Sequence, residues 1–362
     1  YMQRKLGVLV HGAGWVATQH IDAFCRNPHA EVVAISSRRR SSAEARAAEA
    51  GLDIPCFDRL EEALALPEAD IVSICTPQHV HAENAIAAAQ AGKHLVIEKP
   101  ICNSVAEGRA IRDAIHQAGV KSVVCLVLRW NPLFRTIKRR LADGAIGQVY
   151  SVETAYQSYS GDWWRGFDDA RTKTGGVSSM LVGGCHAVDA LRWFASTEEF
   201  AAADPVEVFA YAGGTRGQAT RQYDPTANNW HQGNPLEYEG LEIALVKFAN
   251  GVLGRITVNH ECIQPYTFPL EIFGDRGTIR NNQMWSHTLP DQKDWQTLPG
   301  IGPDSADVSH HPFQGQMDHF VECIRNDVES HCNFDDAWKT HEVVFAAQQC
   351  YATRRPVTLP LA

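Results

Sequence analysis

A chain of 362 residues, 44% of them hydrophobic, is too long for one ordinary hydrophobic core and predicts two domains. The formal net charge of −9 argues against nucleic acid or an anionic membrane surface as the main partner, and no apolar run has membrane-spanning length. The ten cysteines include no Cys-x-x-Cys pair, and several lie within apolar runs. We therefore expect free thiols in a reducing compartment, and hence a cytoplasmic protein.

Short apolar segments alternate with helix-like segments through the first third of the chain. Strands are predicted at residues 6–10, 31–35, 56–57, 69–75, 94–97 and 121–127. Helices are predicted between them, at residues 18–25, 81–91 and 105–118, and after a capping box formed by Ser41 and Glu44. Because these strands are apolar throughout, the pattern predicts a parallel sheet that is covered on both faces.

A glycine-rich turn joins the first predicted strand to the first predicted helix. It reads Gly12-Ala13-Gly14-Trp15-Val16-Ala17, which is the Gly-x-Gly-x-x-Ala fingerprint of dinucleotide binding. The first glycine permits a tight turn, and the second lets a pyrophosphate approach the amino end of the helix. We expect Gly12, Gly14, Trp15 and Val16 to contact such a cofactor.

The end of the second strand distinguishes the two nicotinamide cofactors. NAD-binding proteins usually carry an acidic residue there for the ribose hydroxyls. This chain instead has Ser36, Ser37 and Arg38, which suit a 2′-phosphate through charge-assisted hydrogen bonds. The sequence predicts NADP or NAD as the cofactor and favours NADP.

A charged pair, Glu98-Lys99, ends the fifth predicted strand, and Pro100 turns the chain at that point. The carboxyl ends of the strands are where an open α/β sheet binds its ligand. We therefore expect Lys99 to lie beside the nicotinamide, where it can stabilise the alkoxide that develops on a substrate hydroxyl.

The chain resembles the Gfo/Idh/MocA oxidoreductases, the family of glucose–fructose oxidoreductase and inositol dehydrogenase. The resemblance rests on the fingerprint above and on four stretches: CTPQHVHAENAIAAAQAGKHLVIEKP at 75–100, RWNP at 129–132, TGGVSSMLVGGCHAVD at 174–189 and EIFGDRGTI at 271–279. It implies an N-terminal Rossmann domain (1–128) with a doubly wound parallel sheet. An α+β domain (129–362) with a large, open, mostly antiparallel sheet follows.

The family resemblance also implies functional residues. Thr76, Pro77 and His81 border the cofactor, and Glu98 and Lys99 meet its nicotinamide end. The implied substrates are pyranoses, cyclitols or related polyols. An open sheet with apolar residues on its bare face further predicts a homodimer or homotetramer.

His186 is the second candidate catalytic residue, as the base that accepts the substrate proton. In the family pattern an aspartate precedes this histidine by one helical turn, but Val182 occupies that position here. Asp189 shares a helix face with His186 and could orient it. A carboxylate from the preceding loop (Asp162, Asp168 or Asp169) is the alternative partner.

Substrate contacts are predicted for Arg129, Asp162, Trp163 and Trp164. A sugar ring can stack its C–H groups on the aromatic plane of Trp163 or Trp164, and packing within the loop is the alternative role of these two residues. His260, His310 and His311 match no recognised ligand spacing, so no metal is expected.

Three functions remain open at this point. The first is a sugar or polyol dehydrogenase. The second is a glycosidase or lyase that oxidises carbon 3 of its substrate transiently, which the loss of the aspartate makes worth considering. The third is a cofactor-binding sensor without catalysis, against which Glu98, Lys99 and His186 argue.

Overall fold

The computed structural model describes residues 4–159, 168–215, 221–224, 229–232, 235–303 and 311–361. The chain divides into two compact units. The first runs to Trp130 and takes up a later segment that ends at Ala337, and the second contains the remainder. Over the residues that are described, no helix combines the length and apolar character needed to cross a membrane.

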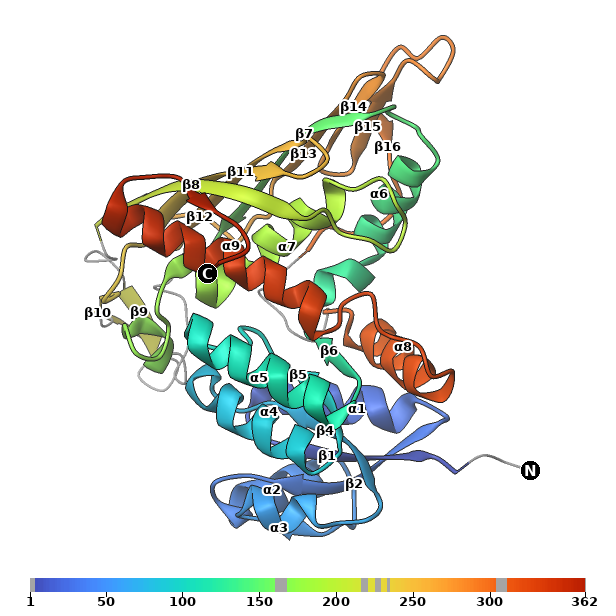
Figure 1. Ribbon diagram of the computed structural model, residues 1–362, viewed down its shortest axis with the longest axis vertical. Coiled ribbons are helices and arrows are strands. Elements are labelled where there is room, and N and C mark those ends of the chain that lie inside the picture. Colours follow the sequence, from blue (N-terminus) through green and yellow to red (C-terminus); the bar gives the residue numbers. More distant parts are fainter. Residues whose placement is uncertain are drawn as a thin grey trace. The chain divides into compact units, whose positions relative to one another are not determined.

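The first unit is built on a six-stranded sheet with the order β3-β2-β1-β4-β5-β6, in which all pairs are parallel. The strands are β1 (Leu6–His11), β2 (Ala30–Ser36), β3 (Cys56–Phe57), β4 (Ala69–Ile74), β5 (His94–Ile97) and β6 (Ser122–Val124). The helices between them are α1 (Trp15–Arg26), α2 (Arg40–Glu49), α3 (Leu60–Leu64), α4 (His81–Gln90) and α5 (Val105–Ala118). This doubly wound arrangement confirms the predicted Rossmann sheet (Figure 1).

Capping residues in the sequence correctly predicted both ends of α5 but not the beginning of α2. Helix α5 begins at the predicted residue because the Ser104 side chain accepts a hydrogen bond from the Glu107 amide, and it ends at Gly119, which has φ of 65°. The predicted capping box at Ser41 is wrong, because α2 already begins at Arg40. Glu44 pairs with Arg40 one turn earlier, at 3.0 Å, and so supports the helix surface instead of its cap.

Helix α8 (Phe313–Arg325) belongs to the first unit, although the sequence assigned everything after residue 128 to the second domain. Asn27 donates to Asp318 at 2.7 Å, and Gln314 donates to the carbonyl oxygen of Ala23 at 3.1 Å. These bonds hold α8 against α1. The chain therefore returns to its first unit before it completes the second, which no local signal indicates.

The second unit is built on a nine-stranded sheet with the order β16-β15-β14-β13-β7-β12-β11-β8-β17. Only β7 and β12 pair in parallel among these described strands, so the sheet is mostly antiparallel, as predicted. The strands are β7 (Val149–Gln157), β8 (Pro205–Gly213), β11 (Leu241–Phe248), β12 (Leu253–Asn259), β13 (Leu270–Gly274), β14 (Gly277–Arg280), β15 (Gln283–Ser286), β16 (Gln296–Thr297) and β17 (Val357–Thr358). A separate pair is formed by β9 (Arg221–Asp224) and β10 (Asn229–Gln232).

One face of the large sheet carries α6 (Pro132–Ala142), α7 (Cys185–Phe194) and α9 (Phe334–Thr353), as Figure 1 shows. The burial of β11 alternates accordingly: Ala244 and Val246 are buried toward the helices, whereas Ile243, Leu245 and Lys247 are exposed on the opposite face. The second unit therefore presents one covered and one open sheet face.

Candidate active site

The glycine turn of the first unit has the geometry of a phosphate cradle. Gly12 has φ of 116°, and a Cβ atom placed there would lie 2.5 Å from the carbonyl oxygen of Cys75. Gly14 is the N-cap of α1, has no side-chain cap, and a Cβ atom there would meet no atom within 4 Å. At Gly12 the backbone thus lies against the residue that follows β4. At Gly14 the amino end of α1 is open to a ligand, and such an opening fits the pyrophosphate of a dinucleotide. Trp15, exposed, and Val16, half-buried, follow at the start of the helix.

The three residues predicted to hold a 2′-phosphate are not equivalent. Ser36 is fully buried, and its hydroxyl lies 2.8 Å from Nδ1 of His11. Burial lowers the pKa of His11 to about 4, so its ring is neutral near pH 7. The structure therefore places Ser36 inside the sheet, and of the three predicted residues Ser37, half-buried, and Arg38, exposed, remain available to a ligand.

The loop after β4 is tied to the loop after β5 by a buried histidine. The two ring nitrogens of His81 lie 2.8 Å from the carbonyl oxygen of Thr76 and 2.6 Å from that of Pro100. Asn84 donates to the Thr76 hydroxyl at 3.1 Å. His81 thus fixes the two loops that frame the carboxyl ends of β4 and β5, with Thr76 half-buried and Pro77 exposed beside it.

The Glu98 carboxylate is buried inside the first unit, whereas the family resemblance predicted that it meets the nicotinamide. It lies 2.9 Å from Nε2 of His20 on α1 and accepts a hydrogen bond from the backbone amide of Lys99 at 3.1 Å. The other ring nitrogen of His20 lies 2.7 Å from the Ser73 hydroxyl on β4. Burial is the largest single influence and opposes ionisation of Glu98. The hydrogen bond and charge of His20, together with the charges of Lys99 and His81, outweigh it, so the pKa of Glu98 lies below the usual value.

This network gives Glu98 a different role from the one expected. It links α1, β4 and the end of β5 and fixes the backbone of Lys99, whose own half-buried side chain follows at the strand end. Sequence reasoning missed His20, although its place on the first helix six residues after Gly14 was visible. Among the described residues one group of possible metal ligands, His20, Glu98 and Cys125, lies within 4.8 Å, but its closest contact is the hydrogen bond just described.

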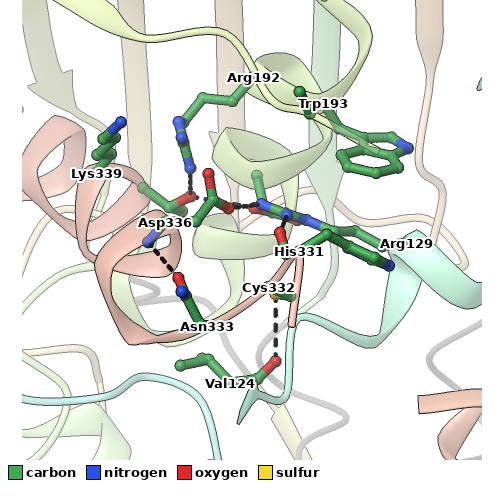
Figure 2. Close-up of polar contacts among 12 residues, drawn as sticks. Val124, Arg129, Arg192, Trp193, His331, Cys332, Asn333, Asp336 and Lys339 are labelled. Carbon is green, nitrogen blue, oxygen red and sulfur yellow. Dashed lines mark hydrogen bonds and ion pairs between the residues drawn. The ribbon is translucent and has the colours of Figure 1, made fainter. Parts of the chain in front are cut away.

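Arg129, for which the sequence predicted a contact with substrate, is buried within the first unit and engaged there by other residues. Its side chain is 1% exposed, forms an ion pair with Asp336 and donates to the carbonyl oxygen of His331 at 2.6 Å (Figure 2). Its neighbour Trp130 stacks on the His331 ring at 5.0 Å. Arg129 thus anchors the returning segment of the chain, because a buried guanidinium needs a carboxylate and carbonyl oxygens as partners.

The predicted loop residues Asp162, Trp163 and Trp164 lie outside the described residues. Asp168 and Asp169 are exposed. The loop end is compact, since a Cβ atom at Gly175 would lie 2.0 Å from the carbonyl oxygen of Asp169, and one at Gly176 would lie 1.9 Å from that of Ala170. The two glycines of the Thr-Gly-Gly stretch therefore let the chain fold back onto this turn.

His186 lies near the beginning of α7 in the second unit and is 7% exposed. Val182, one turn earlier, packs in a small apolar cluster with Leu236 and Tyr238. Asp189 is buried and accepts a hydrogen bond from Thr340 on α9 at 3.1 Å. The position that carries aspartate in the family pattern thus lies in an apolar environment, and an orienting role of Asp189 toward His186 stays a prediction.

Comparisons with known proteins agree with both units. Residues 6–125 match a model described as "Oxidoreductase family, NAD-binding Rossmann fold", and residues 134–280 match "GFO/IDH/MocA C-terminal domain". Levoglucosan dehydrogenase of Pseudarthrobacter phenanthrenivorans is 28% identical over 226 residues, 59% of this chain and about half (55%) of the relative. Inositol 2-dehydrogenase of Rhizobium meliloti is 24% identical over 99% of this chain and 100% of its own.

A solved structure of levoglucosan dehydrogenase in complex with NADH superimposes with a TM-score of 0.84, at 20% identity, over 99% of this chain and 100% of that one. At this identity the likeness establishes the fold.

Proposed function

The chain belongs to the Gfo/Idh/MocA oxidoreductases, a family with an NAD-binding Rossmann domain, and from this premise we propose that it is a sugar, glycoside or cyclitol dehydrogenase. Hydride would pass between the nicotinamide cofactor and a ring hydroxyl or the corresponding ketone. The observation that carries the proposal is Lys99, which follows β5 with its backbone fixed by the buried Glu98. The names of the relatives, an inositol and a levoglucosan dehydrogenase, support polyol or sugar-like substrates.

The chain's own residues fit this chemistry in distinct roles. The Gly12–Gly14 turn fits the pyrophosphate of a dinucleotide, whose nicotinamide supplies the hydride chemistry when bound. Lys99 donates a hydrogen bond to the substrate oxygen and stabilises the negative charge that develops there. His186 accepts the proton of the substrate hydroxyl.

A panel of sugars, glycosides and cyclitols tests the proposal, with NAD or NADP added and the absorbance of reduced nicotinamide recorded over time. We expect steady reduction with at least one polyol. Cleavage of a glycoside without net reduction would instead support transient oxidation at carbon 3, for which the apolar surroundings of Val182 are the specific observation. Tight cofactor binding without turnover on any compound would support a sensor.

Preference for NADP over NAD is the first testable prediction. Ser36 is engaged with His11, so the preference rests on Arg38 and Ser37. An arginine–phosphate contact contributes on the order of 1.5–3 kcal/mol, so Arg38→Ala is expected to weaken NADP binding roughly ten- to hundredfold and leave NAD binding unchanged. Calorimetric titration measures both dissociation constants. Arg40→Ala, which removes a neighbouring arginine paired with Glu44, is the control. An equal affinity for the two cofactors, or tighter NAD binding, in the wild-type protein contradicts the prediction.

We further propose that the open face of the large sheet joins two copies of the chain into a homodimer or a higher homo-oligomer. On this face Leu245 is 56% exposed, Tyr211 65% and Leu253 58%. Leu245 and Phe209 lie opposite each other on β11 and β8, and Ile243 lies opposite Tyr211, so the apolar side chains adjoin across strands. Adjoining exposed apolar side chains of this kind favour burial against a second copy of the same sheet face.

Light scattering is expected to return a mass of at least two chains. Leu245→Glu should dissociate the assembly, because the carboxylate would be buried in the interface. Phe200→Glu, which changes a residue 64% exposed outside the sheet, should leave the mass unchanged. A wild-type protein with the mass of one chain would overturn the proposal.

A further inference from the structure

The segment that leads into the His186 helix has an irregular backbone. Val177 has φ of 67°, a left-handed conformation that is unfavourable for a β-branched residue. Three residues later Met180–Gly184 forms a π-helical turn, and α7 begins directly after it. Both features are rare, and both concentrate at functional sites because they are retained only where the surrounding structure enforces them.

The segment is also packed tightly onto the sheet. A Cβ atom at Gly183 would lie 2.7 Å from the Tyr156 ring on β7, and one at Gly184 would lie 2.4 Å from a methyl group of Val258 on β12. No space remains between the π-helical turn and the sheet. The position of the turn therefore depends on the contacts of the residues just before it, Ser178 and Ser179.

A buried carboxylate binds the residue that precedes the π-helical turn. Glu242 on β11 is 1% exposed, and its Oε1 accepts a hydrogen bond from the backbone amide of Ser179 at 2.9 Å. Its other oxygen, Oε2, accepts from the Tyr351 hydroxyl of α9 at 2.7 Å. The Ser179 hydroxyl donates to the carbonyl oxygen of Glu239 at 2.8 Å, and Gln348 donates to the Ser178 hydroxyl at 3.3 Å. Residues of β11, of the segment just before it and of α9 thus form hydrogen bonds that hold Ser178, Ser179 and the Glu242 carboxylate together.

Glu242 retains its acceptor function in either protonation state. Burial raises its pKa to about 7, although the hydrogen bonds from Tyr351 and the backbone oppose the rise. Near neutral pH both the carboxylate and the acid are therefore present. In the acid form the carbonyl oxygen still accepts from Ser179, and the carboxyl O–H can donate to the Tyr351 oxygen. A glutamine reproduces this second arrangement.

We propose that Glu242, supported by Tyr351, is a positioning residue that holds the strained Val177–Gly184 segment so that His186 is presented correctly for proton transfer. The inference rests on the proposed function, because it assigns His186 a role in the reaction. Glu242 acts through the backbone and contacts neither substrate nor cofactor.

Three variants of the full-length protein test the proposal. Glu242→Leu keeps the size of the side chain but leaves the Ser179 amide and the Tyr351 hydroxyl without their acceptor. It is expected to lower kcat roughly ten- to hundredfold while the dissociation constant of the cofactor stays within about twofold. Glu242→Gln should restore kcat to within about threefold of wild type. The matched control is Glu342→Leu on α9, which removes another buried carboxylate that accepts a backbone hydrogen bond, from Leu361 at 3.1 Å.

Hydrogen exchange read by mass spectrometry supplies a measurement that does not depend on activity. Peptides covering residues 178–186 should exchange about tenfold faster in Glu242→Leu and near the wild-type rate in the glutamine and Glu342→Leu variants. If no polyol is oxidised by the wild-type protein, the proposed dehydrogenase function fails, and the exchange rates still decide whether Glu242 holds the segment. Unchanged exchange and kcat in Glu242→Leu, or equal losses in Glu342→Leu, would overturn the positioning role.

Discussion

Replacement of Lys99 by methionine, or of His186 by alanine, is expected to lower kcat by about 10²–10⁴-fold while cofactor binding changes little. Methionine preserves the length and the apolar stem of Lys99 but removes the ammonium group that stabilises charge on the substrate oxygen. Alanine at position 186 removes the proposed proton acceptor. Steady-state kinetics with the best polyol, together with calorimetric titration of the cofactor, separate the effect on chemistry from the effect on binding.

Lys93 provides a matched control for the first substitution. It precedes the same strand at its opposite end, where its Nζ donates to the carbonyl oxygens of Leu66 and Ala69 at 3.0 and 2.8 Å. Lys93→Met should change kcat less than about twofold, because this lysine is remote in the sheet from the carboxyl ends of the strands. Full activity of Lys99→Met would contradict the proposed mechanism, in which Lys99 stabilises charge on the substrate oxygen. Full activity of His186→Ala alone would make this histidine structural and direct the search for a base to Asp162, Asp168 and Asp169.

Replacement of His20 by alanine is expected to lower the free energy of unfolding by about 3–5 kcal/mol, because it leaves the buried Glu98 carboxylate without its partner. The two groups lie 2.9 Å apart, with side chains 0% and 9% exposed. Glu98→Gln should be milder, since the amide keeps a hydrogen bond without burying a charge. Denaturant unfolding at pH 7 measures the difference. His94→Ala, which removes a half-buried histidine at the other end of β5, should cost less than about 1.5 kcal/mol.

The contribution of Glu98 to stability should depend on pH in a definite direction. Its pKa in the folded protein lies below the usual 4.5, so the folded state binds this proton less readily than the unfolded chain does. The stabilisation is therefore complete above about pH 4.5 and is lost as the pH falls through the lowered pKa. The stability gap between wild type and Glu98→Gln should narrow below pH 4.5, and a gap that widens on acidification would contradict the assignment.

Features that depend on a few neighbouring residues could be predicted from the sequence. The alternation of apolar strands and helices predicted the parallel sheet, since the apolar runs of strands and the spacing of apolar residues in helices can both be recognised within a few consecutive residues. Gly12 was identified because its position demands a backbone without a side chain, and Gly14 because a bare backbone leaves the helix end open to a ligand. Ser104 and Gly119 set the ends of α5. The open sheet face was expected from the family resemblance, and the alternating burial of β11 agrees with it.

Features that depend on distant partners required the tertiary structure. Glu98 and His20 are 78 residues apart, and Arg129 and Asp336 are 207 residues apart, so no local pattern indicates that each charge is buried against the other. The hydroxyl of Ser36 could in principle bind a phosphate, but its place in the strand directs this hydroxyl to His11. The contact of Glu242 with Ser179 likewise arises because the fold brings β11 within hydrogen-bond distance of the residue before the π-helical turn. The sequence by itself determined which residue types stand at the ends of the strands. Packing decided which of their side chains face inward, because a buried polar group must find its partner wherever the fold brings one within hydrogen-bond distance.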